Sequence, residues 1–116
     1  MGYESKVVIN CTKDVLKDYK KIFEKHGFYP DKTYIHNDKV VFYWNWCKWY
    51  DWFDEVKDIM ELTGELIQKD DKNVFGFSRI GEEIDDTEEY GSYYGGHLYI
   101  DVKVDKDFKE VNFNEI

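Results

Sequence analysis

The chain has 116 residues, the size of one domain, which we expect to span residues 1–116. Hydrophobic residues make up 42% and charged residues 35%, a balance that excludes a disordered or collagen-like chain. A net charge of −9 argues against direct nucleic-acid binding, because such proteins neutralise phosphates with basic side chains. Aromatic residues reach 19%, so either the core is very aromatic or some aromatic side chains are exposed.

Other features of the sequence bear on where the protein works. No run of 18 apolar residues is present, so we expect no membrane span. The first ten residues lack a basic region followed by an apolar stretch, and no signal peptide is visible. Cys11 and Cys47 are too few for a disulfide scaffold and fit a reducing compartment. We therefore expect a cytoplasmic protein.

The charge is unevenly spread along the chain. Residues 1–50 hold nine lysines and six acids, whereas residues 51–116 hold seven basic residues and 19 acids. The densest acidic segment places six acids within residues 82–89. Such a segment either keeps a loop soluble or meets a basic partner, which would relieve the repulsion between its like charges.

The first half of the chain predicts a strand, a helix and a β-hairpin. Residues 6–11 carry a β-branched run typical of a strand, and Thr12 is placed to cap the helix that follows. We expect this helix to end at Gly27. Residues 33–36 and 39–45 then predict a hairpin with a tight turn at residues 37–38. Its second strand is apolar on both alternations, which indicates a central position in the sheet.

The second half predicts another helix and further strands. Asp51 is a candidate cap for the second helix, which we expect to stop at Gly64. Leu66 and Ile67 keep the helical period, but the turn-rich sequence after them favours a new strand over residues 65–69.

Residues 74–80 and 97–104 are also expected to be strands. Between them, residues 81–96 form a long loop or an irregular hairpin tip. Residues 105–116 are a polar tail that either adds an edge strand or frays. Two amphipathic helices over one face of a mostly antiparallel sheet would satisfy both hydrophobic patterns. The sequence thus predicts an α+β fold, a two-layer sandwich that is ferredoxin-like or a relative of it.

No residue pattern indicates catalysis, and we expect no enzyme, no metal and no cofactor. The three histidines lie far apart without metal-ligand spacing. A cysteine nucleophile needs a base and an oxyanion site, and Cys47 has only Lys48 beside it, which would lower its pKa a little. Gly91, Gly95 and Gly96 lack the spacing of a phosphate loop.

The tryptophans carry two interpretations. Trp44, Trp46, Trp49 and Trp52 lie close together in the sequence, and Trp44 and Trp46 share one alternation of a strand. We expect them to be mainly core residues, with any exposed remainder serving as an interface anchor. Exposed aromatic faces would alternatively bind a small ligand such as a sugar or a nucleotide.

The segment 75–89, FGFSRIGEEIDDTEE, is similar to strand-then-acidic-turn elements of small phage proteins. In size, acidity and lack of a catalytic motif, the chain resembles phage-encoded inhibitors of bacterial defence. Anti-CRISPR proteins are the best known of these, and several are acidic mimics of nucleic acid. The resemblance implies action inside the bacterial host cell and supplies no site residues. Because the first half is basic, mimicry would involve only one face.

These features predict a non-enzymatic inhibitor that sets an acidic surface against the basic groove of a nucleic-acid-handling defence protein, such as a CRISPR effector. The predicted partner-binding residues are Glu82, Glu83, Asp85, Asp86, Glu88, Glu89, Tyr90, Tyr93 and Tyr94. Further acidic residues that would help are Asp70, Asp71, Asp101, Asp105 and Asp107. We expect no direct contact with nucleic acid or membrane. The alternative is a small-ligand or nucleotide-binding module that uses the aromatic cluster.

Overall fold

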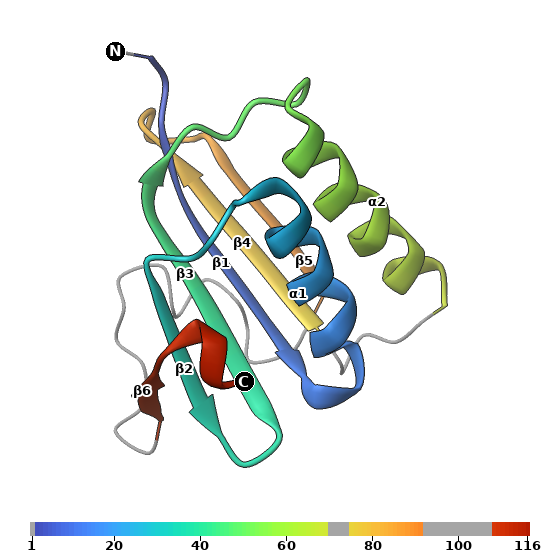
Figure 1. Cartoon of the computed structure of the whole chain (residues 1–116). Coiled ribbons are helices and arrows are strands. Elements are labelled where there is room, and N and C mark those ends of the chain that lie inside the picture. Colours follow the sequence, from blue (N-terminus) through green and yellow to red (C-terminus); the bar gives the residue numbers. More distant parts are fainter. Residues whose placement is uncertain (1, 70–74, 92–107) are drawn as a thin grey trace.

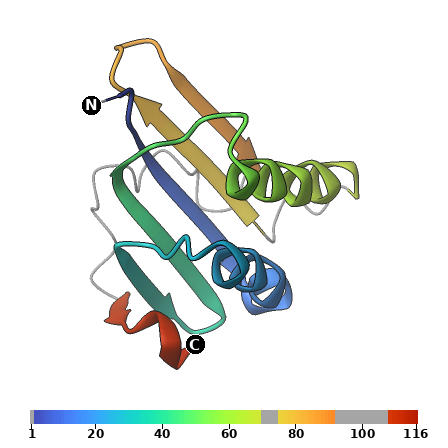
Figure 2. The same cartoon turned by 45° about the horizontal axis from the view of Figure 1, so that its top comes forward.

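The computed structural model describes residues 2–69, 75–91 and 108–116, which form an antiparallel sheet and two helices (Figure 1). The elements are β1 (Ser5–Thr12), α1 (Lys13–His26), β2 (Lys32–His36), β3 (Lys39–Cys47), α2 (Asp54–Gln68), β4 (Phe75–Gly81), β5 (Thr87–Gly91), β6 (Lys109–Val111) and a 3₁₀ turn at Phe113–Glu115. The six strands lie in the order β5-β4-β1-β3-β2-β6, and every pairing is antiparallel. Both helices lie over the same face of the sheet (Figure 2). The α+β class predicted from the sequence is therefore confirmed.

The main core lies between the helices and the sheet. Alternate residues of β1, including Val7 and Ile9, point to this side and are fully buried. Phe23 of α1 sits at the centre, where its ring meets the rings of Phe42 and Trp44 edge-on at 5.0 Å. Burial of each such side chain stabilises the fold by roughly 1.5–3 kcal/mol, and edge-on aromatic pairs add further to this.

The opposite face of the sheet also buries apolar side chains. Val8 of β1 packs with Val41 and Tyr43 of β3, and all three are buried. Tyr34, Ile80 and Phe108 pack against this cluster. Both alternations of β3 are thus buried, which confirms the prediction that this strand is central.

Helix α1 ends as predicted but begins differently. Gly27 adopts a left-handed conformation with φ of 63°, and Phe28 N donates to Phe23 O to close the last turn. Thr12 occupies the N-cap position, but its hydroxyl makes no capping bond. The Lys13 N–H instead donates to the Asp38 carbonyl at 2.9 Å. The chain of the β2–β3 turn therefore holds the start of the helix.

Helix α2 corrects two predictions. It begins at Asp54, with Phe53 rather than Asp51 at the N-cap position. It also continues through Gly64 to Gln68, so the expected strand at residues 65–69 is wrong. The reason is the buried stripe along this helix, which Leu66 extends. Burying one leucine stabilises by roughly 1.5–3 kcal/mol, which outweighs the cost of about 1 kcal/mol for glycine in a helix.

The hairpins follow the sequence closely, with one correction. Asn37 has a positive φ of 55°, as the predicted tight turn at residues 37–38 requires. Residues 81–96 were expected to form a long loop or an irregular hairpin tip, and the described part is a hairpin, because Thr87–Gly91 pairs with β4 as strand β5. The tail adds an edge strand, since β6 pairs with β2. Residues 97–104 lie outside the described residues, so that predicted strand is not described.

Substitution of Gly64 by alanine should stabilise the protein. A Cβ at this helical position meets nothing within 4 Å. Alanine should therefore raise the free energy of unfolding by roughly 0.5–1 kcal/mol, measured by urea denaturation. Gly27→Ala is the matched control and should destabilise by roughly 1 kcal/mol, because the left-handed φ strains a residue with a Cβ. Equal effects of the two substitutions would contradict this account of α2.

Candidate partner-binding surface

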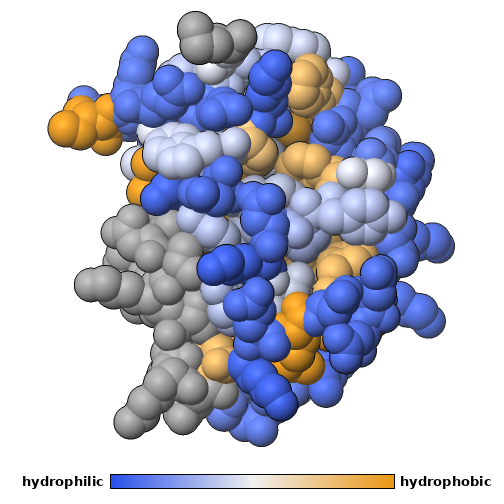
Figure 3. All heavy atoms as spheres, turned by 60° about the vertical axis from the view of Figure 1, so that its left-hand side comes forward, coloured by the Kyte–Doolittle hydropathy of each residue, from blue (hydrophilic) through white to orange (hydrophobic). Residues whose placement is uncertain are grey.

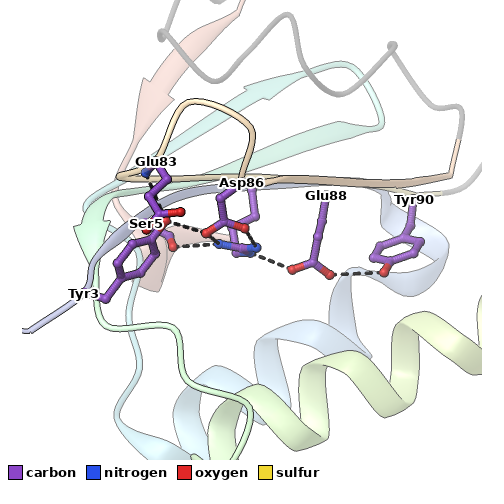
Figure 4. A network of polar contacts seen from close by, with 7 residues as sticks. Tyr3, Ser5, Glu83, Asp86, Glu88 and Tyr90 are labelled. Atoms are coloured by element: carbon purple, nitrogen blue, oxygen red, sulfur yellow. Dashed lines mark hydrogen bonds and ion pairs between the residues drawn. The ribbon is translucent and has the colours of Figure 1, made fainter.

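The acidic segment is organised around the side chain of Arg79, whose partners Ser5, Asp86 and Glu88 are labelled in Figure 4. Arg79 shares one side of β4 with Phe75 and Phe77, and it is only 8% exposed. A charge so far removed from water needs anionic partners. Nη2 donates to Asp86 Oδ1 at 2.6 Å and Nε donates to Glu88 Oε1 at 2.7 Å. Two of the six predicted carboxylates therefore point inward.

Further bonds fix the turn that carries Asp86. The Tyr3 hydroxyl donates to Asp86 Oδ2 at 2.5 Å, and Gly81 N donates to the Asp86 carbonyl at 2.7 Å. A Cβ on Gly81 would collide with the Asp86 carboxylate and the Tyr3 hydroxyl. The Arg79 guanidinium, followed by the Tyr3 hydroxyl, lowers the pKa of Asp86 from 3.8 to about 2. Asp86 also raises the pKa of Tyr3, through the same hydrogen bond.

The other predicted carboxylates lie on the surface. Glu82, Glu83, Asp85 and Glu89 are exposed. Glu82 Oε2 accepts a hydrogen bond from the Glu4 N–H at 2.5 Å, so the N-terminal segment lies against the turn. We call residues 82–85 the acidic turn.

Of the three predicted tyrosines, Tyr90 lies in the described part of the chain. Tyr90 is half-buried, with its ring 5.8 Å from that of Phe77. Its hydroxyl donates to Glu88 at 3.1 Å, and this bond raises the pKa of Tyr90. Tyr93 and Tyr94 lie outside the described residues. The same is true of the acidic residues expected to help, which are Asp70, Asp71, Asp101, Asp105 and Asp107.

Exposed apolar side chains flank the acidic turn instead. Ile84 is 93% exposed at its tip. Trp46, which is 40% exposed, lines a hollow with Gly2, Glu4 and Glu82. Trp52 is 67% exposed and lines a second hollow with Asp86 and Glu88. The four tryptophans therefore fall into two groups: Trp46 and Trp52 are exposed, whereas Trp44 and Trp49 are buried in the core.

A β-bulge sets the position of Trp46. Ser5 pairs with Cys47 and Val7 with Trp44, so β3 has one more residue than β1 over this step. Trp46 adopts a left-handed conformation with φ of 61°, which is rare for a bulky residue. The bulge breaks the alternation that would otherwise place Trp46 on the same side as Trp44. Alternation alone predicted the wrong side for this residue.

The aromatic side chains around Trp52 form a stacked group. The ring of Tyr50 stacks on that of Trp52 with centres 4.9 Å apart and planes 8° from parallel. Phe53 meets both rings edge-on. This packing holds Trp52 in place although most of its surface faces solvent. Trp46 and Trp52 were not among the predicted partner-binding residues, although the sequence left open that an exposed tryptophan anchors an interface, and Ile84 was missed altogether.

The cysteines and histidines show no catalytic arrangement in the described ranges. Burial raises the pKa of both thiols to about 12, so the expected lowering by Lys48 at Cys47 is wrong. His26 Nε2 lies 2.7 Å from Asp58 Oδ2 and links α1 to α2. This contact, followed by that from Lys25, lowers the pKa of Asp58. Within residues 2–69, 75–91 and 108–116, no group of three or more His, Cys, Asp or Glu side chains could hold a metal ion.

Basic side chains gather elsewhere on the molecule. Lys13, Lys17, Lys20 and Lys21 of α1 line a hollow of about 620 Å³ with Ile116. The side of the protein that Figure 3 brings forward is mostly hydrophilic, with hydrophobic side chains in small separate patches. A partner surface that combines charge with a few apolar contacts fits this pattern better than a broad apolar interface.

No family model matches the chain, and no significant match was found among curated proteins or solved structures. Neither helix among the described residues is long and apolar enough to cross a membrane.

Removal of the Arg79 guanidinium should destabilise the turn and the fold. Arg79→Met leaves the inward carboxylates of Asp86 and Glu88 without their cation. We expect the free energy of unfolding to fall by roughly 1–3 kcal/mol in a urea titration. The loss should be smaller than the 3–5 kcal/mol typical of fully buried pairs, because both carboxylates are about one-third exposed. The free energy of unfolding of Arg79→Lys should lie between those of wild type and Arg79→Met. Lysine keeps the positive charge but lacks the planar guanidinium that bonds both carboxylates. An unchanged midpoint for Arg79→Met would contradict the network.

The stability that Asp86 contributes should disappear in acid. Its pKa is about 2 in the folded protein and near 3.8 when unfolded, so its contribution is complete above pH 4. The contribution is lost as the pH falls from about 4 towards 2. The difference in unfolding free energy between wild type and Asp86→Asn should therefore shrink over this range. Denaturant titrations at pH 7, 4, 3 and 2 measure it, and a constant difference would count against the assignment.

Proposed function

We propose that the protein is a non-enzymatic inhibitor that binds a nucleic-acid-handling bacterial defence protein, as anti-CRISPR proteins do. Its acidic turn would enter a basic groove in place of nucleic-acid phosphates. The observation that carries the proposal is the grouping of exposed carboxylates with exposed tryptophans at one end of the sheet. Carboxylates complement the charge of a basic groove and raise the association rate. Tryptophans are among the residues that dominate binding hot spots.

The internal bonds of the turn favour this role. Recognition of a basic groove requires carboxylates at fixed positions, because a flexible loop loses conformational entropy on binding. Asp86 is held by Arg79 and Tyr3, and Glu82 by the Glu4 N–H. The exposed acids of the acidic turn therefore start from an ordered backbone. In this proposal, the inward carboxylates of Asp86 and Glu88 fix the backbone, and the exposed carboxylates of the acidic turn contact the partner.

We also propose that the fold is a two-layer α+β sandwich related to ferredoxin-like folds. Support comes from the order β1-α1-β2-β3-α2-β4, in which the four strands lie side by side as β4-β1-β3-β2. In this relation, β5 and β6 are additions to the two edges. The acidic turn then belongs to the hairpin that extends the β4 edge, outside the unit that runs from β1 to β4.

Reversal of charge in the acidic turn should abolish partner binding and leave the fold intact. The variant carries Glu82→Lys, Glu83→Lys and Asp85→Lys, and it retains Asp86 and Glu88 for Arg79. Exposed charges contribute only about 0–1 kcal/mol to stability, so the melting temperature should change little. Each partner cation left unpaired should cost about 2–5 kcal/mol of binding.

The measurement is affinity capture from a bacterial lysate, followed by identification of the bound proteins and elution with double-stranded DNA. Wild type should retain a nucleic-acid-binding protein that DNA displaces. Retention should also weaken as salt rises, because the screening length falls to about 3 Å at 1 M. A variant with Glu61→Lys, Glu65→Lys and Glu110→Lys changes the net charge equally and should bind normally. Equal capture by wild type and the turn variant would refute the proposal, and a retained small molecule would support the ligand-binding alternative.

A further inference from the structure

We propose that Trp46, Glu4 and Glu82 form a pocket for an arginine side chain of the partner. This proposal rests on the proposed function and specifies one of its contacts. With Gly2, the three residues line a hollow of about 410 Å³. Glu82 is the first residue of the acidic turn, so an arginine bound here would belong to the same partner surface that the turn meets.

The indole ring of Trp46 is suited to a cation. Lys6 of this chain places its Nζ 5.4 Å from the ring centre. That contact is a cation–π interaction, which draws a positive charge to the face of an aromatic ring. Because the side chain is 40% exposed, the ring also presents surface to a partner. Tryptophan is the aromatic residue that binds cations most strongly.

The two carboxylates supply the charge complement. The Glu4 N–H holds the Glu82 carboxylate through a bond of 2.5 Å, so this acceptor is fixed beside the hollow. A carboxylate offers about four acceptor positions, and a single backbone bond leaves capacity for a guanidinium. Glu4 also lines the hollow and brings a second acidic residue to it. Together the two acids outweigh the single charge of Lys6.

Arginine fits this combination better than lysine. A guanidinium is planar, so it can stack on an indole while its edge donates paired hydrogen bonds to a carboxylate. A lysine ammonium is a compact and strongly hydrated charge, which would form the ion pair without the stacking. Arginine is also the residue that nucleic-acid-handling proteins use for paired bonds to phosphate. The pocket would therefore bind an arginine side chain that the partner otherwise uses to contact nucleic acid.

The left-handed backbone at Trp46 gives a clean test. Its φ of 61° is unfavourable for tryptophan and accessible to glycine. Trp46→Gly should therefore keep the bulge and the sheet while removing the ring. Loss of binding without loss of melting temperature would assign the ring to recognition rather than to folding.

The experiment uses two peptides, nona-arginine and nona-lysine, titrated into the full chain by calorimetry at low salt. Wild type should bind nona-arginine more tightly. Trp46→Gly should bind nona-arginine roughly tenfold more weakly and should lose the preference. Tyr29→Ala is the matched control, because it removes an exposed aromatic side chain that does not line the hollow, and it should keep the preference. Glu4→Gln combined with Glu82→Gln should also lose the preference, which covers the case that Trp46→Gly fails to fold.

Two results would overturn the pocket. One is equal affinity of wild type for the two peptides, and the other is a preference that persists in Trp46→Gly or in the double glutamine variant. These results are distinct from failure of the proposed function, which is decided by DNA-displaceable capture and by reversal of the acidic turn. If capture by wild type survives and the arginine preference is absent, the pocket is rejected and the function stands.

Discussion

The buried charge of Arg79 constrains the end of the sheet that carries the acidic segment. An arginine side chain that is 10% exposed has lost most of its hydration, and only well-placed anions can compensate for that loss. Asp86 and Glu88 provide them from the turn and from β5. Because both anions follow Arg79 closely in the chain, their bonds close the β4–β5 hairpin. The carboxylates of Asp86 and Glu88 would otherwise repel each other, and the Arg79 guanidinium between them offsets that repulsion.

The same bonds decide which acids face solvent. Two carboxylates of residues 82–89 are committed to Arg79, so the surface carries fewer charges than the sequence suggests. The electrostatic mimicry that we propose would therefore be weaker across a whole face, and the lysines of α1 add positive charge elsewhere. A binding mode with few charges needs other sources of affinity. Trp46, Trp52 and Ile84 are exposed beside the turn and provide the apolar contacts that carboxylates lack.

The fold was largely predictable because its signals are local and periodic. The strand at residues 6–11, the helix that ends at Gly27 and the turn at Asn37 all follow from short patterns. The end of α2 was not predictable from Gly64, since a tertiary contact of Leu66 overrides the local signal.

The candidate site was predictable only in part. The acidic segment is visible in the sequence, but the inward direction of Asp86 and Glu88 depends on a buried arginine. One signal could have revealed it, because Arg79 alternates with Phe75 and Phe77 on one side of a strand and must find anions nearby. No comparable pattern in the sequence indicates the β-bulge at Trp46. One extra residue in β3 reverses a side chain, and nothing in the alternation indicates where that residue is inserted.

The division of the aromatic residues connects stability to function. Phe23 meets Phe42 and Trp44 edge-on in the core, where burial of each ring stabilises the fold more than one exposed contact does. A core of this quality can hold a backbone conformation at Trp46 that is unfavourable by itself. The Trp46 side chain is 40% exposed, and the Lys6 ammonium lies over its ring. The sheet thus maintains a left-handed and exposed tryptophan beside the acidic turn, an arrangement that the proposed recognition of a cationic partner would explain.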